Sequence, residues 1–254
     1  HEGDWFKTRG PFTVPRTPQG RPVLIQAGQS GRGRRFAARW GELVFAIAPT
    51  FERGQQIYKE LKAEVAACGR DPDQFFIAPA VCCITGETQS MAEDKAALID
   101  DLAIDEDKIV LLSEVLNFDF GTLGLDDPLD DAAIRSISGL QALRDRVLEV
   151  TGKDHPTPRD FIDVSRRGTI HEVPLFVGTP TQIADELERW FVGRACDGFV
   201  VMATHIPGAY EEFSRLIVPD LQRRGILHND YAGATLRENL GLPRAQRHDW
   251  VHNA

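Results

Sequence analysis

The sequence predicts an α/β fold with a parallel β-sheet whose strands are covered on both faces. Two observations lead to this fold class. Four short apolar runs are continuous rather than alternating, which is typical of parallel strands buried on both faces. Segments with helical periodicity separate these runs, as in βαβ units. The predicted strands are Pro22–Ala27, Leu43–Ile47, Phe75–Thr85 and Phe199–Ala203.

The first predicted strand opens through a glycine-spaced turn onto a helix. The turn is Gly28-Gln29-Ser30-Gly31, and three apolar residues share one face of the helix that follows: Phe36, Ala37 and Trp40. Free N–H groups and the helix dipole favour an anion at such a helix start. The Ser30 hydroxyl adds a donor, and Arg32, Arg34 and Arg35 add positive charge. We therefore predict a phosphate site. The alternative is an ordinary βα turn, because the spacing fits neither G-x-G-x-x-G nor the P-loop.

Helix start and stop signals place four further helices. Thr50 precedes a helix over Phe51–Ala67, and Ser90 with Glu93 has capping-box spacing ahead of a helix over Met91–Leu102. The sequence Thr179-Pro180-Thr181-Gln182 opens an amphipathic helix that continues to Phe191. A last helix is predicted over Ala209–Arg224, where Gly225 stops it.

The strand and helix alternation fails between about residues 104 and 168. Helices are predicted over Asp105–Leu116 and Asp131–Val150, and a third begins at Thr157. A region of this length inside an α/β pattern indicates a lid or cap insertion. The polar tail over about residues 228–254 is expected to lie on the surface.

Composition excludes several classes of protein. The 254 residues carry a net charge of −9, and no basic stripe stands out beyond the turn arginines, which argues against a nucleic-acid partner. No apolar run approaches the roughly 20 residues that cross a bilayer, and no signal peptide is recognisable. Four cysteines without C-x-x-C spacing or a histidine cluster predict no metal site and a cytoplasmic location. We expect all four to be buried, reduced packing residues: Cys68, Cys82, Cys83 and Cys196.

Four ordered segments together resemble the luciferase-like flavin-dependent monooxygenases. The subgroup that the chain is most similar to contains nitrilotriacetate monooxygenase component A and dibenzothiophene-sulfone monooxygenase. The segments that carry the resemblance are HEGDWFKTRGP over residues 1–11, PQGRPVLIQAG with Ser30 over residues 18–30, VGTP over residues 177–180 and TLRENLGLP over residues 235–243.

The resemblance implies a TIM barrel of which this chain is the C-terminal half, strands five to eight, with a helical insertion. Residues 1–254 are then one partial barrel domain. It further implies the oxygenase component of a two-component monooxygenase. Such an enzyme takes FMNH2 from an NAD(P)H:flavin reductase, binds O2 as a flavin hydroperoxide and inserts one oxygen atom into a small organic substrate. A homo-oligomer is expected by the same resemblance.

The resemblance also assigns candidate site residues, and no catalytic residue can be named among them. It places Gly28, Gln29, Ser30 and Gly31 at the FMN phosphate. Phe45 and Ile47 are substrate-pocket candidates, because barrel active sites gather at the carboxyl ends of strands.

Two further pocket candidates lie in or beside the predicted insertion. Phe120 either covers the pocket as part of a lid, with Phe118, or anchors its loop to the protein. His171 either lines the substrate entrance or is a plain loop residue. His205 either touches flavin or substrate or is a surface or helix-capping histidine. The alternative function is a non-catalytic half-barrel that binds phosphate or flavin, or an assembly module, and needs a partner chain. A half-barrel leaves open sheet edges that favour pairing.

Overall fold

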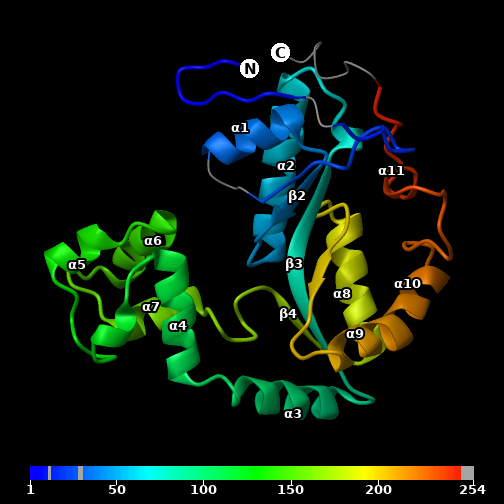
Figure 1. The fold of residues 1–254 in the computed structure, drawn as a ribbon. Coiled ribbons are helices and arrows are strands. Elements are labelled where there is room, and N and C mark those ends of the chain that lie inside the picture. The colour runs from blue at the N-terminus through cyan, green and yellow to red at the C-terminus, as the bar shows by residue number, and fades with distance from the viewer. Residues whose placement is uncertain (11–12, 28–30, 247–254) are drawn as a thin grey trace.

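The computed structural model describes residues 1–10, 13–27 and 31–246. A five-stranded parallel sheet forms its centre (Figure 1), which confirms the predicted fold class. The strands are β1 (Ile25–Gln26), β2 (Leu43–Ala46), β3 (Phe76–Thr85), β4 (Leu175–Gly178) and β5 (Val200–Met202).

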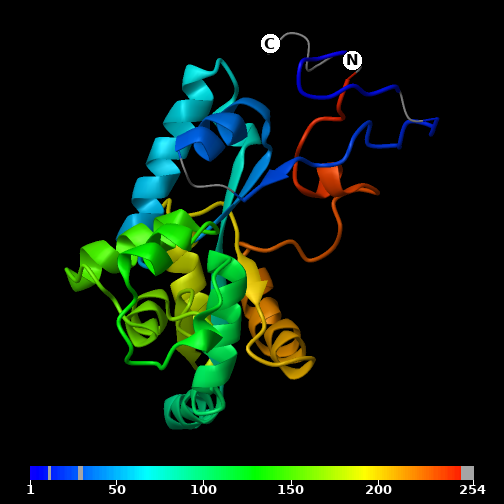
Figure 2. The same ribbon diagram turned by 60° about the vertical axis from the view of Figure 1, so that its left-hand side comes forward.

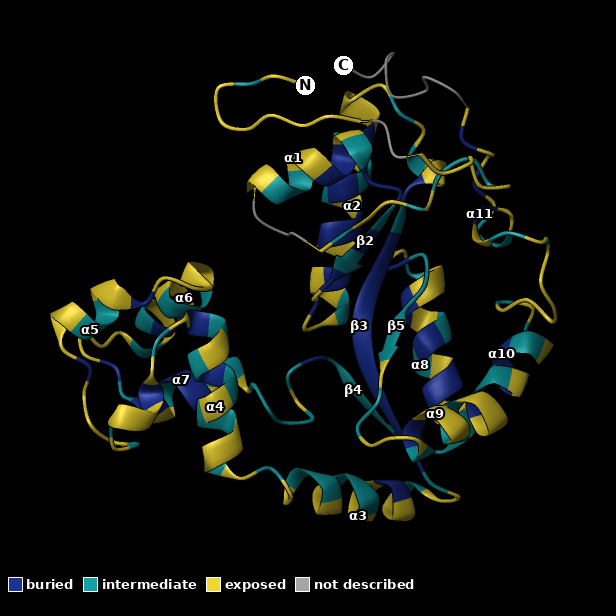
Figure 3. Ribbon diagram, in the orientation of Figure 1, coloured by how far each residue is buried: buried dark blue, intermediate teal, exposed yellow. Residues whose placement is uncertain are grey.

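Strand β3 is the longest strand and holds the sheet together. Its first half pairs with β2, Leu43 opposite Phe76, and its second half pairs with β4, Cys82 opposite Leu175. The N–H groups of Phe76 and Cys82 donate to Glu42 and Pro174, so β2 and β4 share one edge of β3. Strand β5 pairs along the other edge, with Met202 opposite Cys82. In Figure 3 β3 is the most continuously buried ribbon of the sheet.

Helices cover one face of the sheet. The buried residues on this face include Val44, Ile77 and Val81 of the strands, together with Leu61 of α2 and Trp190 of α8. The opposite face carries a smaller apolar cluster around Ala80, Cys82 and Val173, with Phe45 and Leu175 packed against it. Within the described residues, the expected covering of the strands is therefore extensive on one face, whereas the other face carries only this smaller cluster. The helices that cover the sheet are α1 (Gly31–Trp40), α2 (Phe51–Ala67), α8 (Pro180–Val192) and α10 (Val218–Arg223).

The segment between β3 and β4 is helical and carries a core of its own. It stands to one side of the sheet in Figure 1 and packs around Leu112, Phe120 and Phe161, which are fully buried. After α3 (Gln89–Asp100) the helices are α4 (Asp105–Leu116), α5 (Asp131–Ser136), α6 (Gln141–Thr151) and α7 (Pro158–Ser165).

The two ends of the described chain lie side by side, as Figure 2 shows from a second direction. The N–H of Ala245 donates to the carbonyl of Gln19, 3.3 Å away, and the N–H of Arg237 donates to the Gln19 side chain. Arg237 belongs to α11 (Leu236–Asn239), and its side chain is buried although it comes from the predicted surface tail.

Several predicted boundaries agree with the structure. Helix α2 spans the predicted residues, and Thr50 caps it by accepting from the N–H of Arg53. The Thr179–Gln182 capping box is present at α8. The predicted helix over 209–224 is observed as α9 (Gly208–Glu212), a π-helical turn over Phe213–Ile217, and α10.

Five local expectations were wrong. Strand β4 was missed, and Thr88 rather than Ser90 caps α3. The predicted helix over residues 131–150 is two helices, broken near Gly139, where an added Cβ would lie 2.2 Å from the Val115 carbonyl oxygen. Phe36 is 55% exposed, because α1 buries its two alanines instead. Cys68 is exposed, whereas the other three cysteines are buried as expected.

Candidate functional site

The described part of the predicted phosphate turn is the start of α1. Gly28, Gln29 and Ser30 lie outside the described residues, and α1 begins at Gly31. The first turn of α1 holds no acidic residue. The Arg35 guanidinium approaches this end, with Nη1 3.6 Å from the position that a Cβ would take on Gly31. The helix start is therefore positively charged and free of competing carboxylates, as an anion requires.

Arg34 serves a different purpose from the one predicted. Its guanidinium donates to Glu60 at 2.7 Å and to Glu64 at 2.5 Å, both on α2. These bonds tie α1 to α2 and occupy Arg34. Arg32 and Arg35 have no carboxylate partner among the described residues, so they are the arginines left to attract an anion.

Phe45 and Ile47 lie at the carboxyl end of β2. The Phe45 side chain packs beside Cys82 and Val173 on the face that lacks a helical layer. Ile47 is 42% exposed immediately after the strand. Both positions suit a pocket wall, and their contact with a substrate stays a prediction.

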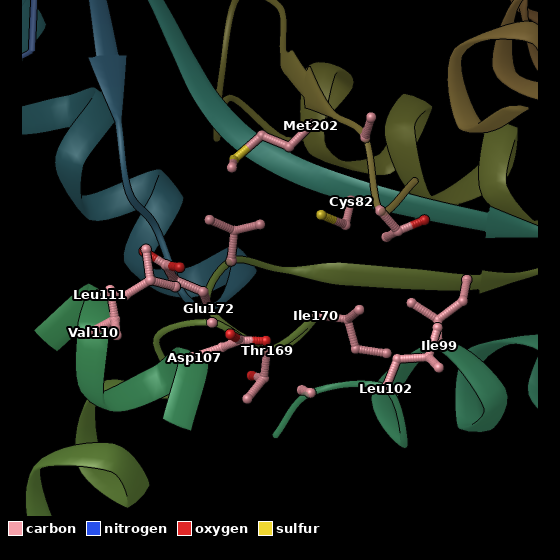
Figure 4. A pocket seen from close by; sticks show the side chains of 15 residues that line it. Cys82, Ile99, Leu102, Asp107, Val110, Leu111, Thr169, Ile170, Glu172 and Met202 are labelled. Carbon is pink, nitrogen blue, oxygen red and sulfur yellow. The ribbon is translucent and has the colours of Figure 1, made fainter. Parts of the chain in front are cut away.

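A cavity of about 550 Å³ opens at the carboxyl end of β5. Figure 4 shows Met202 and Cys82 on its strand side and Ile99, Leu102 and Ile170 on the opposite side. The cavity lies between the sheet, α3, α4 and the segment over residues 168–173. Its lining is Cys82, Ile99, Leu102, Ala103, Asp107, Val110, Leu111, Gly168, Thr169, Ile170, Glu172, Val173, Met202, Ala203 and Thr204.

The walls are mainly apolar, with two carboxylates. Glu172 accepts from Arg167 at 2.7 Å. Burial raises the pKa of the Cys82 thiol, and the negative charge of Glu172 adds to this effect. Cys82 therefore stays a neutral packing group and is no nucleophile at neutral pH.

Gly168 closes one side of the cavity by its close approach to α4. Its φ of +76° favours glycine. A Cβ there would lie 3.1 Å from Cδ1 of Leu111 and 3.3 Å from Cγ of Lys108. The chain can therefore pass directly against α4 before it enters β4.

The start of α1 and the cavity each follow the carboxyl end of a strand, because all the strand pairs are parallel, but they lie at different levels of the sheet. Gln26 is level with Val44 and, through it, with Ile77, whereas Met202 is level with Cys82. Five residues of β3 thus separate the two levels, about 16 Å along the strand.

Phe120 lies away from the cavity, and its pocket role is corrected accordingly. It is fully buried in the core of the helical segment, with ring centroids 4.8 Å from Phe118 and 5.1 Å from Phe161. Of its two interpretations, the geometry agrees with the anchor, because a ring held on all sides by its own segment cannot cover a pocket.

The two candidate histidines flank the cavity without lining it. His171 lies between two lining residues, but its Nε2 faces Asp100, 3.5 Å from Oδ2. His205 follows the lining residue Thr204, whose hydroxyl lies 3.2 Å from His205 Nδ1, and its side chain is exposed. Sequence reasoning missed Asp107, Glu172 and Met202. The one available signal was that Met202 lies near the carboxyl end of a predicted strand, Phe199–Ala203.

Neither a metal site nor a membrane-spanning helix is found in the described residues. No group of three or more His, Cys, Asp or Glu side chains there is arranged to hold a metal ion. The helices described are all too short or too polar to cross a bilayer.

Comparison with known proteins agrees with the sequence motifs. Residues 1–198 match the profile of the luciferase-like monooxygenase family. The chain is 42% identical over 249 residues to dibenzothiophene-sulfone monooxygenase of Rhodococcus erythropolis, covering 95% of this chain and 53% of that protein. It is 35% identical to nitrilotriacetate monooxygenase component A of Aminobacter aminovorans, covering 96% and 53%. The chain thus spans about half the length of the curated relatives it matches.

A solved structure resembles the whole chain. The riboflavin lyase RcaE, solved with modified FMN and riboflavin, superimposes with a TM-score of 0.79 at 26% identity. The match covers 100% of this chain and 55% of that one. The overall fold of the chain is therefore shared with part of a protein that was solved with a modified FMN.

Proposed function

The chain belongs to the luciferase-like monooxygenase family, and from this premise we propose that it acts in the oxygenase component of a two-component, FMNH2-dependent monooxygenase. The observation that carries the proposal is that the positively charged start of α1 and a largely apolar cavity each follow the carboxyl end of a strand in one parallel sheet. One feature suits a phosphate and the other a small organic substrate.

The residues at the turn fit the anionic end of FMN. The N–H groups at the start of α1 and the hydroxyl of Ser30 would hold the phosphate, together with Gly28, Gln29 and Gly31. Arg35 and Arg32 would supply charge, because α1 has no acid in its first turn and Arg35 reaches back to Gly31. We propose that Arg34 contributes only indirectly, by fixing α1 on α2.

Bound reduced FMN would supply the two electrons that let one oxygen atom of O2 enter the substrate while the other leaves as water. The chain's own residues would hold and shield the reactants. Leu102, Val110 and Met202 would offer a bound substrate an apolar wall. Phe45 and Ile47, at the end of β2, would border the substrate on the side toward the turn.

The remaining parts of the proposal follow from the family. The sheet would be strands five to eight of a TIM barrel, and the segment over about residues 104–168 would be an insertion that walls the cavity. An NAD(P)H:flavin reductase would deliver the reduced FMN. The sulfone and aminopolycarboxylate named for two relatives mark the range of substrates to be tried.

The test supplies NADH, FMN, a purified flavin reductase, ¹⁸O₂ and dibenzothiophene sulfone. The expected result is a product that carries one ¹⁸O atom and forms only with the chain present. Reductase alone is the control, because reduced FMN leaks electrons to O2 without help. Absence of label for a panel of candidate substrates, both with this chain alone and with the first half of a relative added, would refute the proposal.

A second candidate is a half-barrel module that is inactive until a partner chain completes it. The observation in its favour is that β1 and β5 each pair along one edge within the described residues, while Ile25 of β1 is 61% exposed. An unpaired strand edge is a template for another strand. Label incorporation that requires the added half would support this module over a self-sufficient oxygenase.

A further inference from the structure

The charged side chains that line the cavity at the carboxyl end of β5 are all acidic among the described residues. The described lining contains two carboxylates, Asp107 and Glu172, and no lysine, arginine or histidine. The other lining side chains are apolar apart from two threonines and the neutral Cys82. A ligand in this cavity therefore meets apolar groups and negative charge.

Three basic side chains beside the lining are already paired with carboxylates, so they cannot neutralise an anionic ligand without breaking an existing contact. The pairs are Arg167 with Glu172 at 2.7 Å, Lys108 with Asp105 at 3.0 Å and His171 with Asp100 at 3.5 Å. His205, which follows the lining residue Thr204, faces the Thr204 hydroxyl instead.

Asp107 differs from Glu172 because it has no basic partner among the described residues. It lies in the first turn of α4, beside Glu106 and Asp105. An anionic group entering the cavity would meet this exposed carboxylate, whereas an apolar group would gain from contact with the apolar lining.

We propose that this wall of the cavity selects uncharged, largely apolar substrates, such as sulfones or hydrocarbons, and rejects anions, with Asp107 as a determinant of that choice. The inference rests on the proposed function, because that function makes the cavity the substrate site. It narrows the substrate class beyond what the relatives indicate.

The two methionines of the chain allow ligand binding in the cavity to be measured directly. Met202 lines the cavity, whereas Met91 lies on α3 outside the lining and is 51% exposed. With [¹³C-methyl]methionine labelling, NMR then reports one signal inside the cavity and one internal control. Methyl phenyl sulfone and benzenesulfonate are suitable probes, because they share a ring and a sulfonyl group and differ in charge.

The sulfone is expected to shift the Met202 signal saturably and to leave Met91 unchanged. Benzenesulfonate is expected to bind at least about tenfold more weakly, the effect of about 1.4 kcal/mol of unfavourable charge. Equal or tighter binding of benzenesulfonate would overturn the proposal. It would also be overturned if the sulfone left Met202 unmoved or shifted both methionines alike.

Asp107→Lys and Glu106→Lys form a matched pair of variants. Both make the same charge change in the same helical turn, but the cavity lining includes Asp107 and not Glu106. Asp107→Lys should tighten benzenesulfonate by about fivefold or more and leave the sulfone within about twofold. An equal effect of the two variants would overturn the role of Asp107.

This titration needs no flavin and no turnover. If the ¹⁸O test fails while Met202 still discriminates the two probes, the proposed oxygenase function is wrong and the cavity's charge selection stands. If oxygenation proceeds and benzenesulfonate binds as well as the sulfone, the charge selection is wrong alone.

Discussion

Arg237 and Glu42 form a buried ion pair although 195 residues separate them in the chain. Two guanidinium nitrogens of Arg237 donate to the two carboxylate oxygens of Glu42, at 2.7 and 2.9 Å. Both side chains are almost fully buried. Glu42 also accepts from the N–H of Leu24 and from Arg21, so one carboxylate joins α11, β2 and the segment that leads into β1.

Arg237→Ala should destabilise the protein strongly, because it leaves the buried Glu42 carboxylate with Arg21 and Leu24 as its remaining partners. Breaking a buried pair typically costs about 3–5 kcal/mol of unfolding free energy. Urea denaturation followed by circular dichroism measures the loss. Arg135→Ala is the control, since Arg135 and Asp131 are both more than two-thirds exposed and should contribute less than about 1 kcal/mol. A similar small effect of both variants would contradict the role of the pair.

Stability should fall in acid partly through Glu42. Burial alone would raise the pKa of this carboxyl, but hydrogen bonds from Arg237, Leu24 and Arg21 outweigh burial and hold the pKa below its ordinary value of 4.5. The stabilisation is therefore present above pH 4.5 and is lost as the pH falls through the lower, folded-state value. Urea midpoints between pH 7 and pH 3 should decline less steeply in Glu42→Gln. A decline parallel to the wild type would show that Glu42 is not one of the responsible groups.

Phe120→Ala should loosen the core of the helical segment. Removing a fully buried phenylalanine typically costs about 3–5 kcal/mol of unfolding free energy. Phe36→Ala on α1 is the matched control, because that ring is mostly exposed and should change stability little. Thermal or urea unfolding compares the two. A Phe120→Ala protein as stable as wild type would contradict its placement in that core.

The four cysteines should differ sharply in reactivity. Burial raises the pKa of Cys83 and of Cys196 to about 12, and it raises that of Cys82 as well. Cys68 is exposed. Because the thiolate is the reactive form, iodoacetamide should alkylate Cys68 first in the folded protein. Peptide mapping by mass spectrometry reads the order. Modification of Cys83 or Cys196 as fast as Cys68 would contradict the described burial.

Local signals predicted those parts of the fold that depend on local chemistry. Thr50, Thr157 and Thr179 each cap a helix, and hydrogen bonds to the nearby backbone are enough to set such a boundary. Gly225, with φ of +71°, follows the last sheet-covering helix as expected.

Elements that depend on distant contacts could not be predicted. Strand β4 is four residues long and runs directly into the α8 cap, so its hydrophobic residues are too few to show the periodicity of a strand. Gly139 breaks a helix because its backbone packs on Val115 and Leu116, which the local sequence does not reveal. The Glu42–Arg237 pair joins the two ends of the chain and has no local pattern at all.

The candidate site likewise combines a feature that the local sequence predicts with features that depend on distant contacts. The helix start at Gly31 follows from the glycine-spaced turn. The cavity walls come from β5, α3, α4 and the segment before β4, and no sequence spacing connects these elements. Asp107 looked like an ordinary acidic residue at a helix start, and its place on the cavity wall depends on the close passage at Gly168.

The most direct test of the account compares reduced FMN with reduced riboflavin, which lacks the phosphate, in anaerobic binding titrations. Ser30→Ala should weaken FMN binding by about 1–3 kcal/mol, the usual loss for a hydrogen bond to a charged group, and leave riboflavin affinity unchanged. Ser90→Ala, an exposed serine on α3, should change neither. Unchanged FMN affinity in Ser30→Ala, or an equal loss for both flavins, would contradict a phosphate site at the turn that begins at Gly28.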